Sequence, residues 1–331
     1  PSMSDVARLA RVSTQTVSRV SMGADNVSPA TREKVLRAMN QLGYSPNRAA
    51  QALRRGSFKT IGVLTQQIQR TGEALTTAGV LEAATEADYA VNLVQVKRPE
   101  SDDMRQAVYR LSHQTIDGLV VVQAGRAGLD HLSLPQAMPV AVSDSALVGY
   151  YPSASADQVG GVRDAVGHLL ALGHRTVHHV SGPEGSQSAL IRKATWAACL
   201  REAGAPVPEP VPGDWEAAAG YKAGLHLAAD PDVTAVFCGN DEVALGLIRA
   251  MHEQGRRVPQ DVSVMGFDGL DLGEYSFPPL TTIRQDFKRH GREMVALVLE
   301  QVTTGPVDGS RSVIIPTELV LRGSTTPPPT R

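Results

Sequence analysis

Cysteine, aromatic residues and long apolar runs are all scarce in this chain. Only Cys199 and Cys238 occur among its 331 residues, and no CxxC spacing exists, so the sequence indicates neither a disulfide framework nor a zinc site. We expect two small buried side chains in a reducing cytoplasm. No apolar run reaches the roughly 18 residues of a transmembrane helix, and the N-terminus lacks a secretory apolar stretch. These absences predict a cytoplasmic protein with no membrane partner.

The sequence also lacks the short motifs of common enzymes. No GxGxxG, GxxxxGK[ST] or GxSxG pattern is present, and the nine histidines are scattered. The segment Gly182–Ser186 follows a predicted strand, but it does not end in the Gly-Lys-Ser/Thr of a phosphate loop. We therefore expect no enzyme activity, no cofactor and no metal.

Charge is distributed unevenly along the chain. Residues 1–60 contain ten Lys or Arg against three acidic residues, a net charge of +7. The whole chain carries −2, so the remainder carries −9. A basic N-terminal head on an acidic body is typical of a nucleic-acid-binding segment attached to a soluble domain.

The basic head has the periodicity of a helix-turn-helix. Apolar spacing predicts helices at residues 5–10 and 14–20, with a turn at Arg11-Val12 and Ser13 as an N-cap. A third helix is expected between Ser28, a further N-cap, and Gly43. So short a turn suits the steep crossing of helices in which the second enters a DNA major groove.

The second helix is expected to present Thr14, Gln15 and Arg19 outward. Gln pairs with adenine, Arg pairs with guanine and a Thr methyl group can touch thymine, so these residues could read base edges. They could equally belong to an ordinary solvated helix face, and the basic charge of the head favours the DNA-reading interpretation.

From Thr60 onward, short apolar runs alternate with helices. This pattern predicts an α/β fold of two doubly wound lobes, each with a parallel sheet covered on both faces. Strands or extended segments are expected at 60–64, 90–96, 117–122, 139–143, 176–180, 234–238, 262–267 and 280–283. Helices are expected at 74–87, 102–113, 157–172, 188–203, 216–228, 241–254 and 287–303.

Polar residues gather where the predicted strands end. Ligands in doubly wound sheets bind beyond the carboxyl ends of the strands. The candidates there are Asp144, the 186–188 loop, Asn240-Asp241 and Asp268, with Trp215 in a nearby loop. Carboxylates and amides can bind sugar hydroxyls and an indole can cover an apolar sugar face, so these types fit a carbohydrate.

Motifs spread over almost the whole chain resemble the lactose-repressor (LacI/GalR) family. In the head they are Asp5-Val6-Ala7, Thr16–Val20, Thr31–Val35 and Gly43–Ala50. In the body they include Gly182-Pro183, Gly213-Asp214-Trp215, Asn240-Asp241, Gly266-Phe267-Asp268 and Pro278–Phe287. The resemblance implies a helix-turn-helix head, a hinge helix that folds on operator DNA, and a periplasmic-binding-protein-like effector domain.

The resemblance also implies boundaries and site residues. The head would span residues 1–46, the hinge 47–57 and the effector domain 58–322, with a disordered tail at 323–331. The first lobe would comprise 58–157 and 287–315, and the second 158–286 and 316–322. DNA contacts would come from Ser13, Thr14, Gln15, Thr16, Ser18, Arg19, Asn26, Arg32, Tyr44, Asn47, Arg48, Ala50 and Leu53. Effector contacts would come from Asp144, Ser188, Arg192, Trp215, Asn240, Asp268, Gln285 and Phe287.

Several alternatives remain open at this point. Arg192 and Asp268 could form a structural ion pair, Trp215 could fill a core, and Asn240-Asp241 could cap a helix. The first lobe carries Arg70, Gly72 and Glu73 where the family's namesake has mainly apolar residues, so the effector could differ in shape or charge.

The sequence thus predicts a regulator that a galactoside-like sugar releases from a pseudo-palindromic operator. Co-repression, a sugar receptor without a DNA role and a doubly wound sugar kinase are the rivals. The Pro-rich end cannot form a tetramerising heptad helix, so we expect a homodimer through the first-lobe helix that carries Val80 and Leu81.

Overall fold

The structure, a computed structural model, describes residues 1–45, 57–96, 106–107, 109–111, 116–122, 138–143 and 145–330. The predicted hinge helix and most of the predicted helix at 102–113 lie outside these residues, as do Asn47, Arg48, Ala50, Leu53 and Asp144. The chain divides into an N-terminal unit of residues 1–59 with 115–117, and a large unit of residues 60–114 and 118–331. Each unit is described by itself.

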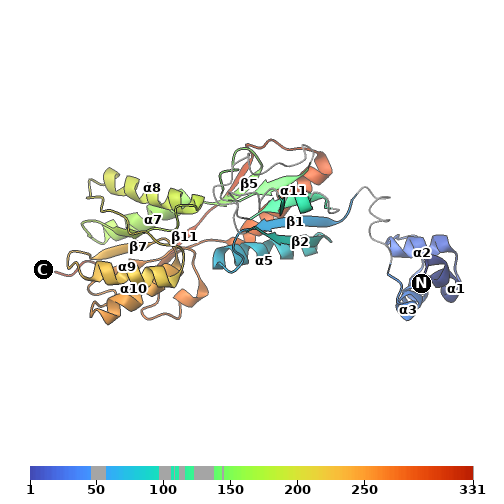
Figure 1. The fold of residues 1–331 in the computed structure, drawn as a ribbon, viewed down its shortest axis with the longest axis horizontal. Coiled ribbons are helices and arrows are strands. Elements are labelled where there is room, and N and C mark those ends of the chain that lie inside the picture. Colours follow the sequence, from blue (N-terminus) through green and yellow to red (C-terminus); the bar gives the residue numbers. More distant parts are fainter. Residues whose placement is uncertain are drawn as a thin grey trace. The chain divides into compact units, whose positions relative to one another are not determined.

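In the described residues of the N-terminal unit, three helices have clear end signals, and Figure 1 labels them. They are α1 (Met3–Ala10), α2 (Thr14–Ser21) and α3 (Pro29–Leu42). The hydroxyls of Ser2, Ser13 and Ser28 each accept a backbone N–H of the helix that follows. Gly43 closes α3 with φ 61°, a left-handed conformation that glycine adopts without strain.

A small apolar core holds these three helices together. Val6 of α1, Val17 of α2 and Val35 of α3 are completely buried against one another. Arg11 caps α1 with φ 53° and lets the chain turn sharply into α2. The predicted helix-turn-helix is therefore confirmed.

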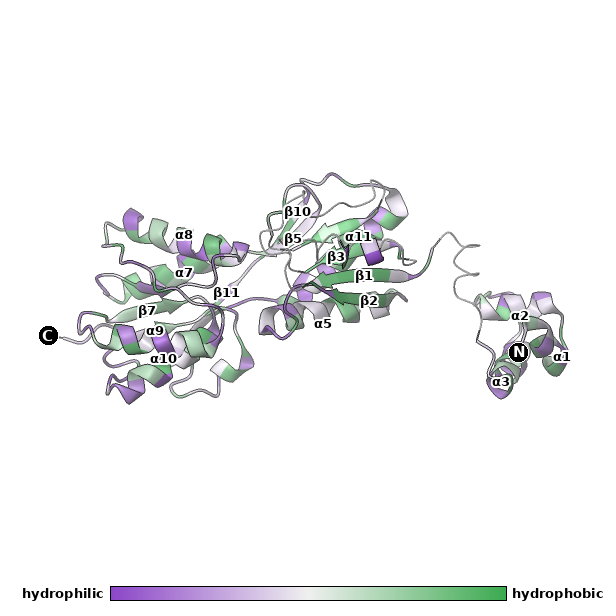
Figure 2. Cartoon of the chain, in the orientation of Figure 1, coloured by the Kyte–Doolittle hydropathy of each residue, from purple (hydrophilic) through white to green (hydrophobic). Residues whose placement is uncertain are grey.

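The large unit begins with a six-stranded sheet of order β10-β5-β4-β3-β1-β2, in which all pairings are parallel. Its strands are β1 (Thr60–Thr65), β2 (Ala90–Gln95), β3 (Gly118–Val121), β4 (Val140–Val142), β5 (Ser153–Ala156) and β10 (Ser312–Ile315). Figure 2 shows β1 as largely hydrophobic, as expected for a strand between two layers of helices. We call this sheet and its helices the first lobe.

Helix α5 (Thr71–Glu86) and helix α11 (Phe287–Thr304) pack against each other in the first lobe. A Cβ atom on Gly79 would lie 2.6 Å from the backbone oxygen of Lys288, so the two helices approach closely there. Val80 is completely buried in the core between them. The prediction that Val80 offers a dimerisation surface is therefore wrong, whereas Leu81 is exposed.

Strands β5 and β10 were not predicted from the sequence. Strand β5 reads Ser-Ala-Ser-Ala and has neither an apolar run nor bulky β-branched residues. It is nevertheless buried, because β10 pairs with one of its edges and Ala154 packs into the core formed with α11. Small side chains are accommodated here by close neighbours, a tertiary effect that the local sequence does not reveal.

The second lobe is built on a parallel sheet of order β6-β7-β8 and a small antiparallel pair, β9 and β11. These strands are β6 (His178–Val180), β7 (Ala235–Cys238), β8 (Ser263–Met265), β9 (Thr282–Arg284) and β11 (Glu318–Val320). Its helices are α7 (Gln158–Ala171), α8 (Gln187–Glu202), α9 (Ala217–Ala228) and α10 (Asp241–Glu253), with a 3₁₀ turn η1 at Asp271–Gly273. Two apolar clusters, centred on Trp196 and on Leu247, fill the lobe.

Helices α9 and α10 lie side by side, as Figure 1 shows, and glycines let them approach closely. A Cβ atom on Gly220 would lie 2.0 Å from the backbone oxygen of Val243. A Cβ atom on Gly246 would lie 1.9 Å from the backbone oxygen of Ala217. Only hydrogen fits at either position, so this helix pair packs backbone to backbone.

The predicted disorder of residues 323–331 is wrong for the residues up to 330 that the structure describes. Ser324 is completely buried, and its hydroxyl accepts the Thr281 N–H (2.8 Å) and donates to the Val264 carbonyl (2.6 Å). The Thr326 N–H donates to the Ser263 hydroxyl (2.9 Å). Gly323–Thr326 are thus held by hydrogen bonds to the second lobe, and the prolines follow afterwards.

Within the described ranges, no helix has the length and apolar character needed to cross a membrane.

Candidate functional site

The outer face of α2 carries the predicted base-reading residues. Thr14, Gln15 and Arg19 are exposed, while Val17 and Val20 face the core. Ser13 and Thr16 hydrogen-bond to each other at the start of the helix. The Thr16 N–H donates to the Ser13 hydroxyl (3.1 Å), and the two hydroxyls lie 2.9 Å apart. The structure thus places a polar helix face outward, with its first turn fixed by capping.

The other predicted DNA contacts within the head have mixed surroundings. Asn26 is exposed and Ser18 is half-buried. The Arg32 guanidinium donates to the Ala24 carbonyl (2.6 Å), which ties α3 to the loop after α2. Tyr44 packs partly against the head core. Arg32 and Tyr44 therefore have structural partners in the head itself, beside any contact with DNA.

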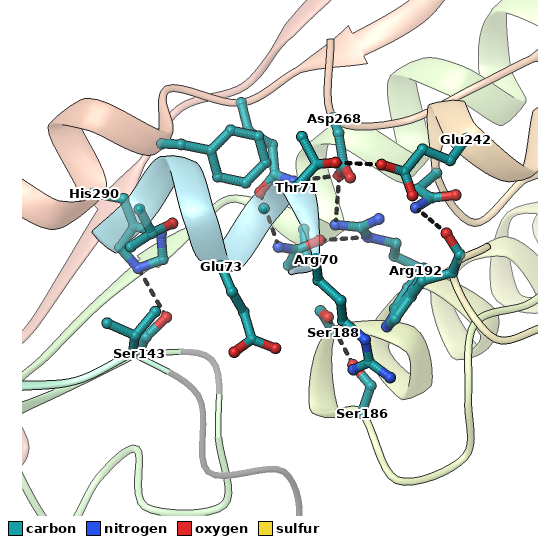
Figure 3. A pocket seen from close by; sticks show the side chains of 18 residues that line it. Arg70, Thr71, Glu73, Ser143, Ser186, Ser188, Arg192, Glu242, Asp268 and His290 are labelled. Carbon is teal, nitrogen blue, oxygen red and sulfur yellow. Dashed lines mark hydrogen bonds and ion pairs between the residues drawn. The ribbon is translucent and has the colours of Figure 1, made fainter. Parts of the chain in front are cut away.

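A pocket in the large unit collects residues from both lobes (Figure 3). It encloses about 680 Å³ of empty space, counting the part open to solvent. Its lining is Arg70, Thr71, Gly72, Glu73, Thr76, Val122, Ser143, Gln158, Ser186, Ser188, Arg192, Trp215, Asn240, Glu242, Asp268, Gln285, Phe287 and His290. Seven of the eight predicted effector residues are among them, and the eighth, Asp144, lies outside the described residues.

Arg192, on α8, organises the second-lobe side of the pocket. Its Nε donates to Gln158 Oε1 (2.8 Å), and its two terminal nitrogens donate to the Gly239 carbonyl (2.5 Å) and to Asp268 Oδ1 (3.3 Å). The guanidinium also lies 3.8 Å from the Phe267 ring centre. A planar guanidinium held on several sides presents fixed hydrogen-bonding geometry to a ligand. The ion pair with Asp268 is real, and it lines the pocket.

Burial controls the ionisation of the two acidic groups beside Arg192. Desolvation raises the pKa of Asp268 to about 6, although the Arg192 charge and the Gln285 amide (2.7 Å) oppose the rise. Desolvation, together with the nearby Asp268 charge, raises the pKa of Asp241 to about 7. Asp241 does not line the pocket. Its carboxylate accepts the Leu270 N–H (2.6 Å) and the Thr282 hydroxyl (2.5 Å), so it fixes the loop that carries Asp268.

The raised pKa of Asp241 predicts a pH dependence of stability. The unfolded chain ionises Asp241 near the ordinary aspartate pKa of 3.8, whereas the folded chain holds the proton up to about pH 7. This group therefore lowers the free energy of unfolding as pH rises from about 4 to about 7. We expect an Asp241→Asn variant to lose that part of the decline in urea unfolding followed by tryptophan fluorescence.

His179 provides an opposing background in the same measurement. Complete burial lowers its pKa to about 4, so this group raises the free energy of unfolding as pH rises from about 4 to about 6.5. The informative quantity is therefore the difference between the variant and the wild type at each pH. A difference that stays constant from pH 4 to pH 8 would contradict the assignment to Asp241.

Trp215 forms one wall of the pocket from a left-handed backbone position, with φ 76°. The Asn240 side-chain amide donates to its carbonyl (3.0 Å), and the Asn240 Oδ1 caps α10 by accepting the Val243 N–H (2.9 Å). The indole covers Gly182, where a Cβ atom would lie 2.4 Å from the ring. Trp215 is half-buried, so a face of it is left for a ligand, and Asn240 both caps the helix and lines the site.

Sequence reasoning missed several lining residues, among them Gln158, Glu242 and His290. Gln158 follows β5, so recognition of that strand would have placed it at a carboxyl end beside the other candidates. Glu242 lies in the first turn of α10, where it accepts the Thr71 hydroxyl of the other lobe. His290 faces Ser143, with Nε2 and Oγ 3.0 Å apart, from a helix that shows no local motif.

The first-lobe side of the pocket is formed by the start of α5. Glu73 is buried, and its Oε2 accepts the Thr65 hydroxyl (2.7 Å) and the N–H groups of Gln66 (3.0 Å) and Gln67 (2.8 Å). Its other oxygen, Oε1, has no partner among the described residues, and neither does Arg70 Nε.

Comparison with known protein families gives two consecutive matches. Residues 2–47 match the family described as bacterial regulatory proteins, lacI family, and residues 166–325 match the periplasmic binding protein-like domain. The lactose operon repressor of Escherichia coli strain K12 is 35% identical over 99% of this chain and 91% of its own length.

Solved structures agree with this result. A lac repressor dimer bound to operator and the anti-inducer ONPF superposes with a TM-score of 0.90 at 33% identity, covering 98% of this chain and 99% of that chain. The transcriptional regulator CelR in complex with cellobiose superposes with a TM-score of 0.74 at 29% identity, covering 98% and 99%. With its helix-turn-helix head and two-lobed pocket, the chain belongs to the lacI family of DNA-binding transcriptional regulators.

Proposed function

We propose that this protein is a homodimeric repressor that leaves its operator when a neutral glycoside, galactoside-like on the second-lobe side, enters the pocket. The observation that carries the proposal is the Arg192 network, in which a buried cation is fixed by Gln158, Gly239 and Asp268 beside an indole face. Such a combination suits sugar hydroxyls and the apolar face of a sugar ring. The complexes of the lac repressor with ONPF and of CelR with cellobiose support the same ligand class.

A ligand in this pocket touches both lobes, so it can change their relative arrangement. It does so only through a difference in its affinity for two arrangements. Thr71 of the first lobe already donates to Glu242 of the second beside the pocket, so the unliganded chain has its own contact between lobes. We propose that the bound glycoside favours an arrangement in which the head no longer holds the operator. Operator binding only in the presence of sugar would reverse the sign.

The dimer is proposed from the lac repressor dimer and from exposed apolar side chains. Leu81 is exposed on α5, and Leu272, Tyr275 and Phe277 are exposed in the segment before β9. Isolated exposed apolar residues are normal on monomers, so their grouping near Tyr275 supports an interface without defining it. Sedimentation equilibrium of the full chain is expected to give a dimer, and a tetramer would contradict this expectation.

The DNA-reading role of α2 is tested by Gln15→Ala and Arg19→Ala. Each is expected to weaken binding to the cognate operator by roughly 1–3 kcal/mol and to relax base preference at one position, because each removes a contact to a base edge. Selection of operators from a random library followed by fluorescence anisotropy measures both effects. Arg37→Ala is the matched control, since Arg37 is an exposed head cation on α3 that pairs with Glu33. Equal losses on random DNA and on the operator would contradict base reading.

A further inference from the structure

We propose that Glu73 selects an effector with a hydroxyl-bearing second unit, such as a disaccharide, over glycosides with alkyl substituents. This inference rests on the proposed sugar-binding role of the pocket and adds the chemistry of its first-lobe side. Figure 3 shows the Glu73 and Arg70 side chains leaving the start of α5, with Arg70 extending toward Ser186 and Ser188 and Glu73 ending at a separate position. Both residues line the pocket.

The two carboxylate oxygens of Glu73 have different surroundings. Oε2 accepts three donors from the end of β1 and the loop after it, so it is held in place. Oε1 is buried and accepts nothing from the described residues, although Glu73 is only 7% exposed. A buried acceptor without a donor costs free energy, and burying a charged one costs more. A ligand that donates to Oε1 would therefore gain more than it would from an exposed carboxylate.

Arg70 decides which kind of donor fits. Its Nε is also buried without a partner in the described part of the chain, so this side of the pocket offers an acceptor and a donor together. A hydroxyl group can donate to a carboxylate and accept from a guanidinium, whereas an ammonium group only donates and an alkyl group does neither. A polyol carries several hydroxyls, so it can donate to Glu73 and accept from Arg70 through different groups.

The second lobe holds the fixed Arg192 network and the Trp215 face, which suit one sugar ring. The part of the effector that extends beyond that ring meets Glu73 and Arg70. The structure therefore points to a glycoside whose second unit is itself a polyol.

The test uses two matched pairs of sugars and the full chain. Isothermal titration calorimetry compares lactose with methyl β-galactopyranoside and cellobiose with methyl β-glucopyranoside. For the pair that the second lobe accepts, we expect the disaccharide to bind the wild type at least about tenfold more tightly than its methyl glycoside. The Glu73→Gln variant is expected to lose most of this preference, measured as the ratio of the two affinities.

Glu73→Gln isolates Oε1. The amide oxygen can replace Oε2 toward Thr65, Gln66 and Gln67, and the amide nitrogen replaces the acceptor at Oε1 with a donor. Glu86→Gln is the control, because Glu86 lies on the same helix and pairs with Arg292 at the surface. Equal thermal unfolding midpoints of the two variants exclude a folding defect as the cause.

Each outcome decides the inference. Loss of the disaccharide preference in Glu73→Gln alone supports it. An unchanged disaccharide affinity in that variant overturns it and leaves the glycoside response intact. If none of the four sugars binds the wild type, this inference and the proposed glycoside effector both fail. Operator binding by the same preparation then still tests the DNA-binding part separately.

Discussion

Arg192→Ala is expected to abolish the response to the sugar while leaving operator affinity almost unchanged. The side chain holds Gln158, Gly239 and Asp268 in one network, so its removal takes away a ligand contact and the support of two further lining residues. Hydrogen bonds to charged groups contribute about 1.5–3 kcal/mol each, so the loss of sugar affinity should be at least about tenfold. Titration of the operator complex with glycosides, followed by fluorescence anisotropy, measures it.

Arg163→Ala is the matched control for this prediction. Arg163 lies on α7 in the same lobe, is exposed and pairs with Glu202 through two hydrogen bonds (2.8 and 3.0 Å). Asp268→Asn should weaken the sugar response more mildly than Arg192→Ala, because the amide oxygen still accepts from Gln285. If Arg192→Ala responds to the wild-type effector at the wild-type concentration, the assignment of the pocket is wrong.

Gly246→Ala is expected to destabilise the second lobe severely. The added methyl carbon would lie 1.9 Å from the Ala217 carbonyl oxygen, and backbone cannot move aside as a flexible side chain can. Forcing apart α9 and α10 should lower the free energy of unfolding by about 3 kcal/mol or more, at the upper end for overpacked cores. Chemical denaturation followed by circular dichroism gives the value.

Gly167→Ala makes the same chemical change with the opposite expected sign. Gly167 is also a helical glycine, on α7, but it is exposed and a Cβ atom there meets nothing within 4 Å. Alanine has the higher helix propensity, so this variant should gain roughly 0.5–1 kcal/mol. If both variants raise the free energy of unfolding by similar amounts, helix propensity outweighs the close α9–α10 contact.

Much of the fold could be predicted because the sequence marks it locally. The head has a serine before each helix and a glycine after the third, and the apolar runs of β1, β3 and β7 mark buried strands. Strand β5 escaped prediction because its Ser-Ala repeat is buried by segments far away in the sequence, among them α11 and the partner strand β10. The order of the tail escaped for the same reason, since Ser324 is held by Val264 and Thr281.

The sequence predicts many of the residues that line the pocket, but not the hydrogen bonds between them. Resemblance located Arg192, Trp215 and Asp268, and the structure brings them together around one space. That Arg192 also holds Gln158 depends on β5, and that Glu73 leaves one oxygen unpaired depends on how β1 meets α5. Such facts depend on contacts between distant segments, so no local pattern contains them.

The path of the chain between the lobes has a consequence for synthesis on the ribosome. The three described helices of the head end by Leu42. The first lobe cannot assemble fully before α11 and β10 have been synthesised, and the second lobe cannot do so before β11 and Ser324. Domains fold in the order in which they emerge, at about 5–20 residues per second. A nascent chain therefore has a folded head many seconds before either lobe can close. A messenger RNA truncated before the codons for α11 would therefore encode the head without either complete lobe.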